Sequence, residues 1–328
     1  MAAFAVIEMR TRNPMFRLPL FRICAFAFGT ISTFLAAVAR GGLMFILIIW
    51  LQGIWLPQHG YNFEQTPLWA GIYMLPLTFG MLAAGPLSGY LSDHFGARPF
   101  ASGGMIGTAI SFLILLMLPT NFPFAVFALA LALSGTSMGM FASPNRAAVM
   151  NSLPRAHRGA GGGMNQTFQN SAQVLSIGVF FTLMIAGLSS TLPETMRNGL
   201  VAHGVPAAVA GHAAQLPPVS ILFAAFLGYN PVQHILGPQV LSALSASNRA
   251  LVTGRSFFPQ LIGGPFQSGL HEAFLFAVIA CLVAAATSLM RGGRFHYTNE
   301  EDAYVPQQMM AGQGEESWPQ AARSPVDE

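Results

Sequence analysis

Charged residues are scarce in this sequence. Only 8% of the residues are Asp, Glu, Lys or Arg, whereas 53% are hydrophobic and the mean hydropathy is +0.53. Soluble domains carry roughly 25% charged residues, so this chain has too few charges to cover a water-exposed surface. The scarcity excludes a soluble globular fold, and the surplus of apolar side chains indicates that much of the surface faces lipid.

Lysine is absent, so the net charge of +3 comes from arginine alone. The arginines stand singly between apolar runs, without the basic stripe and interleaved aromatic residues that are typical of nucleic-acid binding. We therefore expect no nucleic-acid partner and interpret the arginines as positive flanks of membrane-spanning helices. Absent lysine with abundant alanine, glycine and arginine favours a GC-rich bacterial genome.

Cysteine is nearly absent, because only Cys24 and Cys281 occur, both within apolar stretches. They provide neither a disulfide framework nor metal-ligand spacing, and the histidines are dispersed. We expect no metal, no cofactor and no catalytic residue. Residues 135–139 match the nucleophile-elbow pattern Gly-x-Ser-x-Gly, but that pattern needs a strand–turn–helix junction. These residues lie in an apolar helix, where small residues permit close helix packing. A membrane-embedded enzyme is the least favoured alternative, because it would show clustered His, Asp or Glu near an interface.

Long apolar runs are what the sequence has in abundance. A bilayer core needs about 20 mostly apolar residues. Six segments qualify, and they run roughly over 25–56, 68–90, 100–119, 123–143, 164–187 and 271–290. The first exceeds one straight span, so we expect either a kink at Gly41-Gly42 or first turns that lie along the interface. The pattern predicts an all-α integral membrane protein with six spans.

Ten of the fifteen arginines lie in alternate loops or flanks, which orients the spans. They precede the first span, lie between the second and third and between the fourth and fifth, and follow the sixth. These are Arg10, Arg12, Arg17, Arg22, Arg98, Arg146, Arg155, Arg158, Arg291 and Arg294. The positive-inside rule places these loops and both termini in the cytoplasm of a cell membrane. Arg197, Arg249 and Arg255 lie in the long outer segment, but long loops are translocated largely regardless of charge. The protein is thus expected to be a multi-pass membrane protein with the lipid bilayer as its first partner.

The chain divides into five predicted parts. Residues 1–22 form a linker with the stub of a preceding helix, 23–187 carry helices one to five, 188–270 form an extracytoplasmic insertion, 271–290 form the sixth helix, and 291–328 form a disordered cytoplasmic tail. The insertion is rich in Ala, Gly, Pro and Ser, and we expect short helices there. The tail is polar and acidic, which favours disorder.

The most specific motif lies between the second and third spans. Its residues are Gly89, Leu91, Asp93, Gly96 and Arg98. Small residues allow packed helices to approach, Asp93 can accept hydrogen bonds from a helix start, and Arg98 can pair with it. The motif resembles the signature that the major facilitator superfamily carries in each six-helix half. The resemblance implies a conformational switch on the cytoplasmic side, and an ordinary turn with a helix cap is the alternative.

The resemblance extends along nearly the whole chain. Residues 7–22 resemble the linker that opens the second half of the fourteen-helix drug:proton antiporters of that superfamily, and 143–166 resemble a loop of the same half. A long outer segment before the last helix also occurs in this group. The resemblance implies a six-helix half of a major facilitator bundle with a small outer helical insertion. It further implies proton-coupled export of amphipathic organic compounds by alternating access, together with a missing N-terminal half. An inactive or split-gene fragment that acts only with that half is the alternative.

Polar side chains within the spans predict a substrate path of Arg40, Gln52, Asn165, Gln169 and Gln173. A charge at the bilayer centre costs about 2.5–3.5 kcal/mol, so Arg40 should face the bundle interior or a wet cavity unless its role is structural. The four-residue spacing of the last three puts them on one helix face, where they line a path or hydrogen-bond a neighbouring helix.

Glu272 and His271 are a candidate proton relay at the outer entrance of the sixth span. An N-terminal helix cap by Glu272 is the alternative, because a carboxylate is favourable near a helix N-terminus.

Overall fold

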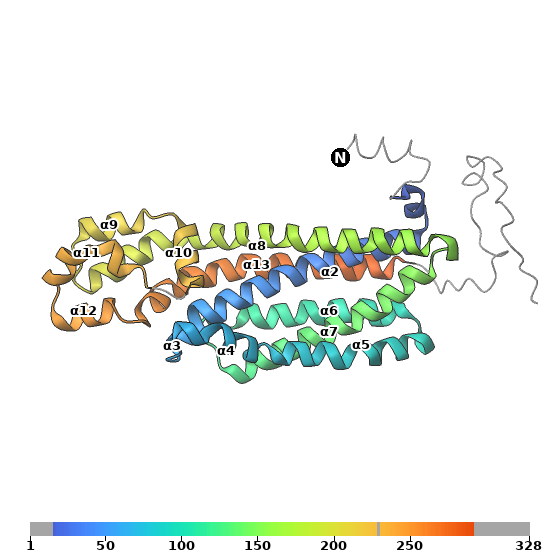
Figure 1. Ribbon diagram of the computed structural model, residues 1–328, viewed down its shortest axis with the longest axis horizontal. Coiled ribbons are helices and arrows are strands. Elements are labelled where there is room, and N and C mark those ends of the chain that lie inside the picture. The colour runs from blue at the N-terminus through green and yellow to red at the C-terminus, as the bar shows by residue number, and fades with distance from the viewer. Residues whose placement is uncertain (1–15, 228–229, 292–328) are drawn as a thin grey trace, which may run out of the picture.

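The computed structural model describes residues 16–227 and 230–291, and these residues are almost entirely helical, without any strand (Figure 1). This confirms the all-α class. Six helical segments within them are long and apolar enough to cross a membrane, which confirms the predicted number. They run over Cys24–Gln58, Thr66–Phe95, Ala97–Met117, Phe124–Asn151, Arg155–Ala202 and Phe257–Leu289. A bent pair, Ala207–Ala214 with Pro218–Ala224, would be a seventh crossing only if its two helices, at 90°, acted as one.

The first span follows a short 3₁₀ turn, η1 (Leu18–Arg22), and consists of α2 (Cys24–Ile49), a π-helical segment η2 (Trp50–Trp55) and α3 (Leu56–Gln58). Helix α2 continues through Gly41-Gly42, so the helix does not break there. The two glycines instead let the fifth span approach, because a Cβ on Gly42 would overlap the ring of Phe180.

The second and third spans meet at a tight turn. The 3₁₀ turn η3 (Phe63–Gln65) leads into α4 (Thr66–Tyr73), and α5 (Leu75–Phe95) completes the second span after a break at Met74. Gly96 then separates α5 from α6 (Ala97–Met117) and has a φ of 88°. Glycine adopts this left-handed region without the penalty that a Cβ would impose, so Gly96 allows the chain to reverse within one residue.

The last three spans are longer than their apolar cores. They are α7 (Phe124–Asn151), α8 (Arg158–Ala202), which follows the 3₁₀ turn η4 (Arg155–His157), and α13 (Phe257–Leu289). Helices α8 and α13 therefore extend well into the segment 188–270. Between them lie the short helices α9 (Ala207–Ala214), α10 (Pro218–Phe226), α11 (Val232–Ala243) and α12 (Ala246–Val252). We call α9–α12 the insertion; it caps one end of the bundle (Figure 1).

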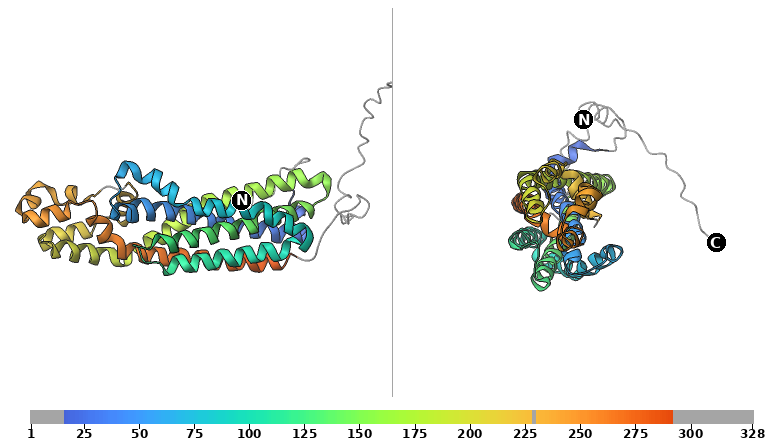
Figure 2. Two further views of the ribbon diagram at one scale, coloured as in Figure 1. Left: turned by 90° about the horizontal axis from the view of Figure 1, so that it is seen from below. Right: turned by 90° about the vertical axis from the view of Figure 1, so that its left-hand side faces the viewer.

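The bundle is built from two packed triplets. Helices α5, α6 and α7 form one triplet, α2, α8 and α13 form the other, and α13 also packs on α6 to join them. Viewed along the long axis, the spans form one cluster (Figure 2). Close contact depends on small residues, because a Cβ on Gly135 of α7 would overlap the backbone carbonyl of Leu77 in α5. Residues 135–139 are thus a helix-packing surface, as the sequence predicted.

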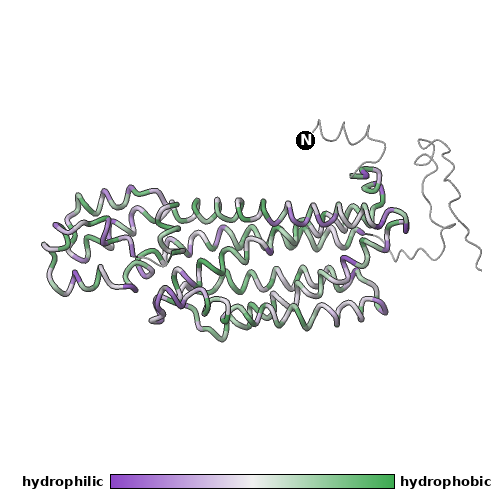
Figure 3. Tube along the Cα trace, in the orientation of Figure 1, coloured by the Kyte–Doolittle hydropathy of each residue, from purple (hydrophilic) through white to green (hydrophobic). Residues whose placement is uncertain are grey.

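The long helices consist mostly of apolar residues (Figure 3), and many of these side chains are exposed on the outside of the bundle. Phe79, Leu82, Leu129 and Val174, for example, are all more than three-fifths exposed. Such side chains are stable only against hydrocarbon, so the surface fits a bilayer. The described chain starts and stops at the end of the bundle opposite the insertion (Figure 1), which we call the terminal end.

Candidate substrate cavity

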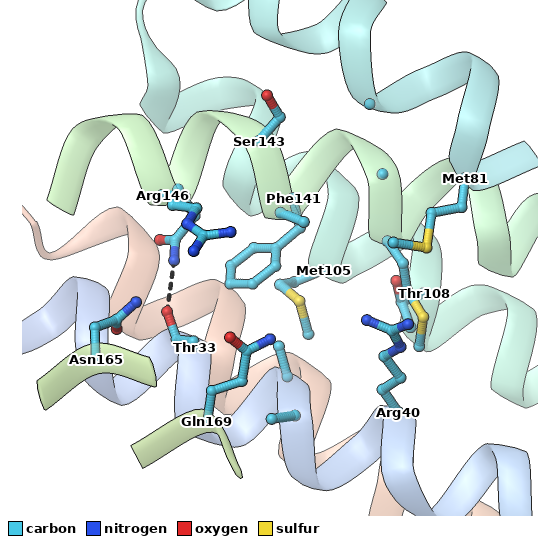
Figure 4. Close-up of a pocket in the computed structure, with 17 residues that line it drawn as sticks. Thr33, Arg40, Met81, Met105, Thr108, Phe141, Ser143, Arg146, Asn165 and Gln169 are labelled. Carbon is cyan, nitrogen blue, oxygen red and sulfur yellow. Dashed lines mark hydrogen bonds between the residues drawn. The ribbon is translucent and has the colours of Figure 1, made fainter. Parts of the chain in front are cut away.

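A cavity of about 390 Å³ lies among the helices of the bundle (Figure 4). Five helices contribute its wall. The lining residues are Thr33, Ala36, Ala37 and Arg40 of α2, Met81 and Gly85 of α5, Met105 and Thr108 of α6, Met138, Gly139, Phe141, Ala142, Ser143, Asn145 and Arg146 of α7, and Asn165 and Gln169 of α8. A cavity of this size, mostly apolar with a few polar groups, is typical of small-molecule sites.

Arg40 projects from α2 into this cavity and is half-buried (Figure 4). Within the described residues, no ion pair or side-chain hydrogen bond involves its guanidinium. The structure thus places the Arg40 side chain in the bundle interior, in the orientation that the sequence predicted. The charge is stable there only if water or a ligand solvates it, because an uncompensated ion in hydrocarbon is costly.

The predicted path residues fall into two groups. Asn165 and Gln169 line the cavity together with Arg40. Gln173 lies one turn further along α8 and is exposed outside the cavity, and Gln52 is half-buried in the π-helical segment, also outside it. Four-residue spacing placed the α8 residues on one face, but that face turns gradually away from the cavity along the helix.

A buried polar network forms one wall of the cavity at the terminal end. The guanidinium of Arg291 donates from Nη2 to Oδ1 of Asn145. The Asn145 amide donates to Oγ1 of Thr33 at 2.7 Å, and that hydroxyl donates to the carbonyl of Gly29 at 2.9 Å. Arg291 and Asn145 are only 5% and 2% exposed. Three spans are thereby joined through side chains.

Arg291 had been interpreted as a flanking arginine of the last span. The structure buries it instead, and its Nε and Nη1 atoms find no partner among the described residues. Burial lowers the pKa of Arg291 to about 10, so the guanidinium stays charged at neutral pH. Its position two residues past α13 looks like an ordinary flank, and only the packing of α13 on α2 brings it inward.

Another part of the wall is apolar and flexible. Met81, Met105 and Met138 come from three different helices, and Phe141 lies beside them. In the view of Figure 4, Phe141 and Met105 lie between Arg40 and Arg146. Methionine side chains are flexible and polarisable, so they adapt to ligands of different shape.

The motif between the second and third spans occupies the end of α5 and the start of α6. Gly89 allows contact with α7, because a Cβ there would lie 2.8 Å from Oγ of Ser143, a cavity residue. Asp93 and Arg98 are both exposed, and no ion pair joins them in the described chain. The expected pair is therefore not formed in this conformation.

Glu272 and His271 do not reach the cavity. Both are exposed, and Nε2 of His271 lies 3.1 Å from the carbonyl oxygen of Leu116 at the end of α6. Helix α13 begins at Phe257, so Glu272 lies well inside the helix. The alternative interpretation of Glu272 as an N-terminal cap is wrong, because the helix starts upstream of the purely apolar core.

Comparison with known proteins identifies a family and several relatives of this chain. Residues 5–177 match the profile of the Major Facilitator Superfamily. The tetracenomycin C resistance and export protein of Streptomyces glaucescens is 25% identical over 288 residues, which cover 88% of this chain and 48% of that protein. The multidrug resistance protein Stp of Mycobacterium tuberculosis (strain H37Rv) is 27% identical over 61% of this chain and 35% of its own length. The multidrug efflux pump LfrA of Mycolicibacterium smegmatis is 22% identical over 78% of this chain and 50% of its own. The chain thus spans about half the length, or less, of the curated relatives it matches.

Proposed function

Because this chain belongs to the major facilitator superfamily, and so is a multi-pass membrane transporter, we propose that it forms the C-terminal half of a fourteen-helix drug:proton antiporter. Its substrates are amphipathic organic compounds, moved by alternating access with binding near the middle of the membrane. The drug-resistance and export functions in the names of its relatives support this proposal. So does the cavity, which is lined by residues of five predicted membrane-spanning helices and combines polar with apolar walls.

The observation that carries the two-half arrangement is the exposed polar face of α8. Gln173 is exposed and lies about 22 Å along the axis from the start of α8, at 1.5 Å per residue. A bilayer core is about 30 Å thick, so this amide would lie in hydrocarbon. An amide without hydrogen-bond partners in hydrocarbon costs several kcal/mol. A second protein surface against α8 would remove that cost, and an N-terminal half is the surface proposed.

The cavity is consistent with the same partner. Ala142 and Arg146 line it and are exposed, so its wall is incomplete on that side. A partner half across this opening would close the site and could alternate between two positions. Asp93 and Arg98 lie at the turn between α5 and α6, and neither has an ion-pair partner among the residues that the structure describes. We propose that they gain partners during this change.

The terminal end is proposed to face the cytoplasm of a cell membrane. The turn η1, the turn between α5 and α6, and the turn between α7 and α8 all lie at that end (Figure 1). They carry Arg17, Arg98, Arg155 and Arg158, in agreement with the positive-inside rule. Protons would then enter from the insertion side. Coupling carboxylates are proposed to belong to the N-terminal half, with Glu272 kept as the acidic candidate of this chain.

The test is accumulation of a fluorescent amphipathic dye in cells of the source organism. Deleting the gene should raise dye accumulation, complementation should reverse the rise, and a protonophore should abolish the difference. Unchanged accumulation of every dye and drug tried would contradict the transport proposal.

The partner is tested separately with a photo-crosslinking residue at Gln173. We expect a crosslinked polypeptide from this position and only lipid adducts from Leu282, an exposed apolar position of α13. Lipid adducts alone at both positions would contradict the second half, and a crosslinked dimer of this chain would replace it with a second copy.

A further inference from the structure

The cavity wall carries two positive charges and no negative one. Arg40 and Arg146 both line it. In the described chain the acidic residues are Glu64, Asp93, Glu194 and Glu272, all of them exposed and none of them part of the lining. A cation entering this cavity would meet two guanidinium groups without a carboxylate to offset them.

The guanidinium of Arg40 is available to a ligand. It has no hydrogen-bond or ion-pair partner among the described residues, and it projects toward the part of the cavity where Thr108 lies (Figure 4). A guanidinium is a planar donor whose fork matches a carboxylate, sulfonate or phosphate with two parallel hydrogen bonds. Because Arg40 is half-buried in the middle of the first span, solvent screens its charge less than at a protein surface, and an anion there gains correspondingly more.

The remaining wall indicates what the anion is attached to. Met81, Met105, Met138 and Phe141 all line the cavity, and Phe141 and Met105 lie between the two arginines in the view of Figure 4. Methionine and phenylalanine favour flat, polarisable ring systems. The Asn165 amide on α8 adds a polar group whose buried Oδ1 atom lacks a partner in the described residues.

We propose that this cavity selects aromatic or similarly apolar compounds that carry a negative charge, held by Arg40 at one side and by Arg146 at the opening. The proposal rests on the transport function proposed above and names its substrate class. Anionic amphiphiles, rather than the lipophilic cations that acidic cavities take, are then the preferred substrates.

Binding is measured on the full chain in lipid nanodiscs, with three ligands of matched shape: 2-naphthoate, its neutral amide, and the 2-naphthyl-trimethylammonium cation. We expect the naphthoate to bind at least tenfold more tightly than the amide, because a charge-assisted hydrogen bond contributes that much, and the cation to bind most weakly. Arg40→Gln should reduce the preference for the anion about tenfold and leave amide binding unchanged. Arg22→Gln, at an exposed arginine of η1 outside the cavity, should change nothing.

Arg146→Gln is the second variant, because this exposed residue can change without disturbing the fold. It should also reduce the preference for the anion. Equal binding of the three ligands, tighter binding of the cation, or no binding of the naphthoate would overturn the proposal. Equal binding of the three ligands is the result expected if a carboxylate from a partner half neutralises Arg40.

The two proposals fail in different ways. Anion-selective binding without any effect of gene deletion on accumulation would refute transport and keep the anion site. Export of cationic dyes together with unselective binding would keep transport and refute the anion site.

Discussion

The buried contact between Arg291 and Asn145 offers the sharpest test of the bundle. Asn145→Leu keeps the side-chain size but removes the acceptor of the Arg291 guanidinium and the donor to Thr33. Arg291→Met removes the charge and keeps a flexible chain of similar length. The two single variants and the double variant form a cycle that isolates the contribution of the contact.

The expected size follows from burial and charge. Neutral hydrogen bonds between membrane helices contribute about 0.6 kcal/mol on average, whereas hydrogen bonds to charged groups contribute about 1.5–3 kcal/mol. Arg291 is 5% exposed, and two of its nitrogens already lack partners, so the upper range applies. Asn145→Leu alone should cost about 2–4 kcal/mol, because it leaves a buried charge without its acceptor. The double variant should recover most of that loss, since the uncompensated charge is gone as well.

The assay is reversible unfolding in mixed micelles, followed by tryptophan fluorescence and repeated by proteolysis. A coupling energy of about 1.5–3 kcal/mol between the two substitutions is the expected result. A value below about 0.5 kcal/mol, the level typical of independent sites, would refute the reasoning. It would mean that Arg291 reaches water or lipid headgroups and that the buried network does not stabilise the bundle.

The other predictions concern packing, topology and switching. Gly135→Ala should prevent α5 and α7 from packing and lower the folded yield several-fold. The control Gly103→Ala, whose Cβ meets no atom within 4 Å, should be neutral or stabilise by about 0.5–1 kcal/mol. Size-exclusion profiles that do not differ between the two variants would contradict this prediction. In a variant without cysteines, a cysteine at exposed His212 should react with an impermeant thiol reagent in intact cells, and one at exposed Phe95 should not; labelling of both would refute the proposed orientation. Asp93→Asn should depress dye export at normal abundance, and unchanged export kinetics would reduce the motif to a turn.

Hydropathy determined the membrane class because it depends on composition within each segment and not on contacts between them. The six spans were found for this reason, and residues 135–139 were correctly assigned to helix packing. Helix ends were less predictable. Helix α13 begins at Phe257 rather than near 271, because helical hydrogen bonding continues past the point where the side chains cease to be purely apolar.

The site was only partly accessible from sequence. Arg40 was singled out because a charge within an apolar run must face a polar environment, and it lines the cavity with Asn165 and Gln169. Asn145 and the three methionines gave no such signal, since amides near a loop and methionines in spans are ordinary residues.

By itself the sequence determined that this is an all-α membrane protein of six spans with a major facilitator motif, because length, hydropathy and local spacing are written in consecutive residues. Only the tertiary structure decided which side chains share a cavity, that Arg291 is buried, and that Gln173 faces outward. These properties depend on how far each helix is rotated about its axis and on the small residues at which helices meet. Local sequence leaves that rotation open, and packing between distant segments sets it.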